Sequence, residues 1–381
     1  MGRPAVAALA FWLICATASG LKGAIGVSAL GPEDSVLSID HRVSHVSTIP
    51  AIAGETVELY VREKVLPGSG RPIVLMVHAA FLSLDSYYDL PVGDYSWMDY
   101  LARAGFDVFA LDLTGVGLSP RPPQIDDPCN ATEAQQAPLI PGLMPAACQP
   151  TYPFQLATIG ADVDQIDATV DYVRTLRGVS RIHLLAHSRG VQRAGMYVAS
   201  RPEKIDRLVL QGASYERATP SEPPQLPAPG VPLDMQTWSM FETNWRRQVD
   251  CQGQLAPSVA DSVRGTMFGL DPTGAAWGPG MLRAPTFTTW GWNAEAAALV
   301  QTPTLIIEGE LDNNSANTNT ERAMQLFEDL GSAQKLFVDV ACTSHYAAWE
   351  SNHLLVFQAA AEWLNNGTVN GVREGSIRIG D

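Results

Sequence analysis

Ser188 lies in the segment LLAHSRG (residues 184–190), where a β-rich run meets an amphipathic helical run. A serine at such a junction projects its hydroxyl from a sharp turn, and the residues two positions on either side must be small. Ala186 and Gly190 meet this requirement. The segment therefore predicts that Ser188 is a nucleophile, and the alternative is an ordinary helix N-cap.

A second serine, Ser258 in APSVA (residues 256–260), also has small residues on both sides. No β-rich run precedes it, and Pro257 occupies the place where the turn would form. The strand and helix around Ser188 distinguish it from Ser258, as this motif requires.

A nucleophilic serine needs a general base, and the base needs an acid that orients it. Only His345 and His353 follow Ser188 in the sequence. His345 comes directly after the β-rich run 335–340, whereas His353 falls within a predicted final helix. We therefore expect His345 to be the base.

The acid should follow the preceding strand, and the segment EGELD (residues 308–312) provides Asp312 there. Glu310 and Glu216 are the other candidates. The order nucleophile, acid, histidine favours Asp312.

The tetrahedral oxyanion needs two backbone N–H donors. We expect one from Arg189, directly after the nucleophile, and the other from Ala80 in the loop that follows the run 72–78. Phe81 is the alternative to Ala80. His78 is predicted to brace this loop by hydrogen bonds.

Short apolar runs alternate with longer amphipathic runs after residue 50, which is typical of an α/β fold. Several of the short runs are apolar without alternation, as in strands covered on both faces. We expect an α/β core of residues 50–213 and 301–366, with a mostly parallel central sheet flanked by helices. The predicted strands are 56–65, 72–78, 106–112, 181–187, 206–211, 304–308 and 335–340, and the predicted helices are 95–104, 159–176, 189–200, 320–330 and 346–365.

Two insertions interrupt this alternation. Residues 120–153 form a Pro-rich loop that carries Cys129 and Cys148, which we expect to pair. Residues 214–300 separate two core strands and are predicted to form a helical lid, because inserts of this length are usually functional or disordered and this one is rich in aromatic residues. We expect Phe81, Trp238, Trp245 and Trp290 to line a substrate pocket; the alternative is that the tryptophans fill the core of the lid itself.

The sequence resembles the α/β-hydrolase superfamily in four places, over roughly residues 70–215 and 300–365. These are VHAA (77–80), DLTGVGLS (112–119), the Ser188 segment, and the stretch from Gly309 through Asp312 to His345. The resemblance implies the α/β-hydrolase fold and a lidded enzyme of the serine esterase or lipase kind, without a cofactor. It also implies that the glycines of DLTGVGLS serve a turn and not a phosphate loop. Related dehalogenases and epoxide hydrolases carry an aspartate as nucleophile, so a serine disfavours their reactions.

These residues predict cleavage of a carboxylic ester or lactone of a hydrophobic small molecule through an acyl-enzyme. One alternative uses the same site on an amide or C–C bond, or for a biosynthetic cyclisation. Another is a non-catalytic binding protein, which would not need all three groups.

The net charge of −15 and pI near 4.8 make nucleic acid an unsuitable partner. Residues 1–18 have a basic start, an apolar run and an Ala-Thr-Ala cleavage site, so we expect a signal peptide and a secreted protein. An uncleaved membrane anchor is the alternative; no later segment is apolar enough to cross a membrane.

Four cysteines remain after residue 18, and the pairing of Cys251 with Cys342 is left open against free thiols. No spacing typical of a metal site occurs. Asn130 and Asn366 stand in glycosylation sequons, as does Asn313.

Overall fold

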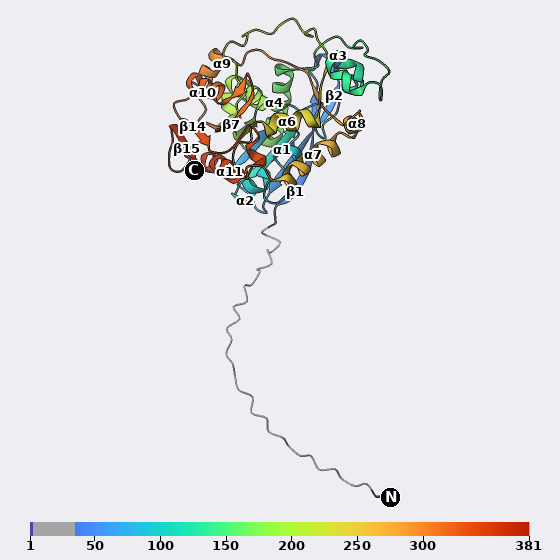
Figure 1. The fold of residues 1–381 in the computed structure, drawn as a ribbon. Coiled ribbons are helices and arrows are strands. Elements are labelled where there is room, and N and C mark those ends of the chain that lie inside the picture. The colour runs from blue at the N-terminus through green and yellow to red at the C-terminus, as the bar shows by residue number, and fades with distance from the viewer. Residues whose placement is uncertain (3–34, 381) are drawn as a thin grey trace.

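The structure is a computed structural model that describes residues 1–2 and 35–380. The predicted signal peptide therefore lies, apart from its first two residues, outside the described residues. The chain from β1 onward folds around one nine-stranded sheet with helices on both faces (Figure 1).

The strands of the sheet lie in the order β1-β2-β4-β3-β6-β7-β11-β14-β15. β1 and β2 pair antiparallel, as do β2 and β4, and every later pairing is parallel. The predicted fold class is confirmed. The bounds are β1 Leu37–Val46, β2 Thr56–Val65, β3 Ile73–Val77, β4 Asp107–Asp112, β6 Ile182–His187, β7 Ile205–Gln211, β11 Thr304–Gly309, β14 Lys335–Val340 and β15 Gly375–Ile379.

Strands β3, β4, β6 and β11 are buried at every position, which explains their continuous apolar runs. The two edge strands, β1 and β15, are not among the predicted strands. Both are largely exposed, so their sequences carry polar residues and no strong apolar pattern.

Helices cover the two faces separately. One face packs against α4, α5, α9 and α10. The other packs against α2 and α11, together with α6 (Trp238–Arg246) and α7 (Pro257–Leu270). Helix α4 begins at an N-cap, Thr158, and ends at Gly178 in the left-handed conformation. The bounds are α1 Leu84–Tyr87, α2 Trp97–Arg103, α4 Ile159–Arg177, α5 Arg189–Ser200, α9 Ala294–Leu299, α10 Thr320–Asp329 and α11 His353–Asn366.

The segment between β7 and β11 contains helices and also a two-stranded antiparallel sheet of β8 and β9. The short strand β10 pairs with β5, which directly precedes α4. The insertion is therefore joined to the core through both strands and helices. The bounds are β8 Leu233–Thr237, α6 Trp238–Arg246, α7 Pro257–Leu270, α8 Pro272–Ala276, β9 Met281–Pro285, β10 Phe287–Thr288 and β5 Ala157–Thr158.

The Pro-rich loop after β4 lies at the periphery and carries the short helix α3 (Glu133–Gln136) (Figure 1). Cys129 and Cys148 form the predicted disulfide. Asn130 is buried; its side chain donates to Gln124 and accepts from the backbone of Thr151. This burial contradicts the expectation of a glycan at Asn130, because its amide nitrogen is already bonded inside the fold. Asn366 is exposed at the end of α11.

Candidate active site

Ser188 sits at the turn between β6 and α5 with φ 54° and ψ −120°. This φ is strained for a residue with a side chain, and such strain is typical of a serine held above the end of a strand. A Cβ at Gly190 would overlap the carbonyl oxygens of Val77 and His78. The glycine therefore lets the first turn of α5 approach the end of β3.

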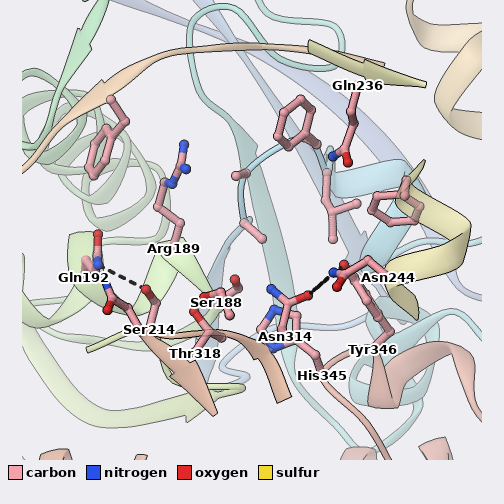
Figure 2. A pocket seen from close by; sticks show the side chains of 18 of the residues that line it. Ser188, Arg189, Gln192, Ser214, Gln236, Asn244, Asn314, Thr318, His345 and Tyr346 are labelled. Atoms are coloured by element: carbon pink, nitrogen blue, oxygen red, sulfur yellow. Dashed lines mark hydrogen bonds between the residues drawn. The ribbon is translucent and has the colours of Figure 1, made fainter. Parts of the chain in front are cut away.

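His345 and Asp312 lie next to each other in the loops after β14 and β11. The distance from His345 Nδ1 to Asp312 Oδ2 is 2.7 Å, and both side chains are buried. Ser188 and His345 line the same pocket (Figure 2). The structure thus brings the predicted nucleophile, base and acid to the carboxyl edge of the sheet.

The competing residues lie elsewhere. Glu310 accepts a hydrogen bond from the Cys342 backbone N–H and pairs with Arg378. Glu216 lies 3.4 Å from Arg322. His353 packs at the start of α11, where it contacts Asp94 and stacks on Tyr95.

Two residues hold the carbonyl oxygen of His345, and the sequence alone assigns a role to neither. His187 Nε2 donates to the carbonyl oxygen of His345 at 3.1 Å, and Gln211 Nε2 donates to the same oxygen at 3.3 Å. Tyr87 stacks on His187 and donates to Gln211 Oε1. Burial, together with the neighbouring His345, keeps the pKa of His187 well below its usual value, so this imidazole stays neutral.

Glu308 is a buried carboxyl at the end of β11 that sequence reasoning also missed. One of its oxygens accepts the backbone N–H of Ala213 at 3.1 Å. Burial, and then the nearby carboxylate of Asp312, raise the pKa of Glu308 well above its usual value. The raised pKa favours the uncharged form of Glu308, because a second buried charge beside Asp312 would be costly.

His78 braces the loop after β3, as predicted. Its Nδ1 donates to the carbonyl of Ala79 at 2.6 Å and its Nε2 accepts from the Leu113 backbone at 3.0 Å. Burial, with Arg193 nearby, lowers the pKa of His78 to about 3. Ala80 and Phe81, the two candidates for the second oxyanion donor, both line the pocket together with Arg189.

The motif DLTGVGLS forms a turn around the side chain of Asp112. Asp112 accepts the backbone N–H groups of Leu84 and Leu118, at 2.8 and 2.9 Å. A Cβ at Gly117 would overlap the Asp112 carboxylate, and Gly117 has φ 54°. Burial raises the pKa of Asp112 to about 7. The glycine and the carboxyl therefore serve the turn that supports the oxyanion loop.

The pocket above Ser188 has a volume of about 390 Å³. Phe81 lines it, together with Phe241 of α6 and Phe287 of β10. Trp238, Trp245 and Trp290 do not belong to this lining. Their place is in the interior of the insertion and at its contact with the core, where large rings bury the most apolar area. Trp245 bonds Glu350, Trp238 packs on Phe241, and Trp290 lies against Gly160.

The insertion is fastened to the two loops that carry the acid and the base. Gln248 Oε1 accepts backbone N–H groups from both loops, at 3.2 Å from Asn313 and 3.3 Å from His345. Cys251 and Cys342, whose pairing the sequence leaves open, form a disulfide. Glu350 accepts hydrogen bonds from Trp245, Gln254 and Ser344.

Within residues 1–2 and 35–380, no group of three or more His, Cys, Asp or Glu residues is arranged to hold a metal ion. No helix in that part of the chain has the length and apolar content needed to cross a membrane.

A sequence profile described as alpha/beta hydrolase fold matches residues 72–250. No curated protein matches the chain by sequence. Among solved structures, an esterase from Thermogutta terrifontis is similar with a TM-score of 0.51 and 19% identity, over 85% of this chain and 98% of that one. An epoxide hydrolase from Vigna radiata has a TM-score of 0.49 and 16% identity, over 86% and 96%.

A 2-hydroxy-6-oxo-6-phenylhexa-2,4-dienoate hydrolase from Rhodococcus sp. strain RHA1 has a TM-score of 0.49 and 16% identity, over 84% and 97%. Identities this low bear on the fold and not on the substrate. The matched profile and the strand order agree with the motifs at the ends of β3, β4 and β6. The chain has the α/β-hydrolase fold, and its residues 72–250 match the sequence profile of that fold.

Proposed function

We propose that the chain is a serine hydrolase that cleaves a carboxylic ester or lactone of a small molecule through an acyl-enzyme. The observation that carries the proposal is the 2.7 Å contact between His345 and Asp312 in a pocket that also exposes Ser188 at its strained turn. Aromatic rings from Phe81, Phe241 and Phe287 support an apolar part of the substrate.

In this proposal His345 takes the proton from Ser188 as its oxygen attacks the ester carbonyl. Asp312 accepts from His345 Nδ1 and stabilises the imidazolium that forms. The backbone N–H groups of Arg189 and of Ala80 donate to the oxyanion. His345 then returns the proton to the leaving alcohol, and a water molecule activated by the same imidazole hydrolyses the acyl-enzyme.

A fluorophosphonate probe tests the nucleophile. We expect it to label the wild-type protein and Ser258→Ala, but not Ser188→Ala. Ser258 is a matched control because it has the same small-residue spacing and is exposed at the start of α7. Labelling of Ser188→Ala, or a wild type that neither reacts nor cleaves any ester, would refute the proposal. A parallel panel of esters, lactones and amides separates the proposed reaction from its alternatives.

We also propose that the protein is secreted. The two disulfides support this, because such bonds persist in oxidising compartments. N-terminal sequencing of protein from the medium of a secreting host should begin directly after Ala18, and retention of residues 1–18 in that protein would contradict it.

A further inference from the structure

The charged residues that line the pocket differ in sign from the net charge of the whole chain. The protein carries 40 acidic residues against 25 basic ones, yet no described Asp or Glu side chain lines the pocket. Among the residues that the structure describes, Arg189 is the one permanently charged residue that lines it, and it directly follows the nucleophile. Among its described lining residues the pocket therefore presents one permanent positive charge and no carboxylate, in a molecule whose net charge is negative.

The guanidinium of Arg189 has no carboxylate of its own. Among the described residues it forms no hydrogen bond or ion pair, and its recorded contact is with the ring of Phe287, 5.3 Å from the ring centroid. The side chain is partly buried at the start of α5. Burial, with Arg193 nearby, lowers the pKa of Arg189 to about 10, so the group is still charged at neutral pH.

Other buried arginines of this chain have such partners. Arg193 pairs with Asp162 at 2.7 Å, and Arg283 pairs with Asp271 at 2.6 Å. Asp162, a nearby carboxylate, is thus already engaged. Asp234, the other acidic neighbour of Arg189, accepts a hydrogen bond from Gln135 instead. Withdrawing a guanidinium from water without a partner costs free energy, which a bound anion would offset.

The position of Arg189 indicates which part of a substrate it would meet. Figure 2 shows Arg189 on the side of Ser188 that also holds Gln192 and Ser214, with His345 and Tyr346 on the opposite side. The leaving alcohol must lie near His345, because that residue protonates it. The acyl group then extends toward Arg189.

We propose that Arg189 binds a carboxylate on the acyl part of the substrate, so that the enzyme prefers monoesters of short dicarboxylic acids. This inference rests on the proposed serine hydrolase function. A guanidinium binds a carboxylate through two parallel N–H donors, which adds selectivity for that group. The backbone N–H of Arg189 is retained in any substitution of its side chain, so oxyanion binding and substrate selection can be separated.

The test compares two 4-nitrophenyl esters of equal length, the monoester of glutaric acid and the corresponding ester of glutaramic acid, whose carboxamide is neutral. We expect wild-type kcat/KM to be at least about tenfold higher for the acid. Arg189→Met should lower kcat/KM for the acid by about tenfold to hundredfold and for the amide by less than about threefold. Arg189→Lys should retain part of the preference, because it keeps the charge.

The control is Arg246→Met, which removes a positive charge from an exposed arginine of α6 that is paired with Glu242. This variant should leave kcat/KM for both esters unchanged. The inference would be overturned if the wild type had equal kcat/KM values for the two esters, or if Arg189→Met lowered both values equally.

Calorimetric measurement of glutarate binding tests the role of Arg189 separately from the hydrolase function, because binding needs no turnover. Ser188→Ala should bind glutarate and the double variant with Arg189→Met should not. Equal binding by both would also overturn the inference, whereas a wild type that binds glutarate through Arg189 but cleaves no ester would refute only the proposed reaction.

Discussion

His345 is held on several sides by residues that are far from it in sequence. Asp312 accepts from its ring, while His187 and Gln211 donate to its carbonyl oxygen. Gly212 lies against the ring, and a Cβ there would come within 2.9 Å of Nδ1. The imidazole can therefore act as a base only while position 212 has no side chain.

Gly212→Ala should reduce kcat by tenfold or more, because the new methyl group displaces the imidazole from Asp312. The matched control is Gly178→Ala at the end of α4. Gly212 and Gly178 have φ values of 57° and 66°, but nothing lies within 4 Å of a Cβ at Gly178. Strain alone should cost each variant about 1 kcal/mol of stability, and only Gly212→Ala should lose activity. Equal kcat values in the two variants would contradict this placement of the ring.

Asp312→Asn should lower kcat by roughly 10³- to 10⁴-fold, because an amide at this position favours the wrong tautomer of His345. Steady-state kinetics on a neutral ester measures the effect. Glu310→Gln changes the neighbouring acidic residue, which faces Cys342 and Arg378, and should leave kcat within about twofold. If Glu310→Gln lowered kcat more than Asp312→Asn does, Glu310 would be identified as the acid.

At the scale of elements, the insertion positions the catalytic loops as well as covering them. Gln248, which follows α6, accepts N–H groups from the loop that carries Asp312 and from His345 itself. The disulfide from Cys251 to Cys342 joins the same segment to the loop just before His345. Displacing this segment would therefore disturb the acid and the base together.

The two disulfides allow this role to be measured. Replacing Cys251 and Cys342 with serine should lower both kcat and stability, whereas the same change at Cys129 and Cys148 should lower stability alone. The chain separations of 91 and 19 residues predict stability losses of about 4–5 and about 3 kcal/mol. Denaturant unfolding and ester turnover at a temperature where both variants are folded check the two effects. Equal retention of kcat would mean that the insertion does not position the base.

At the scale of the whole molecule, several histidines are buried without charge. His183 lies within β6, and burial lowers its pKa to about 4, against the opposing effect of Asp206. His78 and His187 are also neutral in the fold. In the unfolded chain each of these groups would titrate near pH 6.5. The unfolded state therefore binds more protons than the folded state below that pH.

This difference predicts that His183 makes the free energy of unfolding fall as the pH decreases from about 6.5 to about 4. The total contribution is on the order of 3 kcal/mol, and above pH 6.5 it no longer changes. In His183→Gln the slope of this free energy against pH should be smaller by about 1.4 kcal/mol per pH unit within that window. Denaturant unfolding at several pH values measures the slope for both proteins. An unchanged slope would show that His183 is protonated in the fold.

The sequence by itself determined the parts of this protein that depend on local physics. A strand that is apolar throughout, a serine between small residues and a helix after it specify the turn at Ser188, because sterics act over a few residues. The buried strands and the turn at Asp112 follow in the same way. The chain order of Ser188, Asp312 and His345 was readable from the family resemblance.

Only the tertiary structure decided which side chains meet across long stretches of chain. Two phenylalanines of the insertion line the pocket, whereas the tryptophans of the insertion are buried in its interior or against the core. The sequence does not distinguish these two groups, because both consist of large aromatic residues. Gln248, Gln211 and Glu308 carry no motif, because their roles arise from contacts with residues distant along the chain. The sequence indicates a role for the backbone of Arg189, but only the fold shows that its side chain lines a pocket whose described lining residues include no carboxylate.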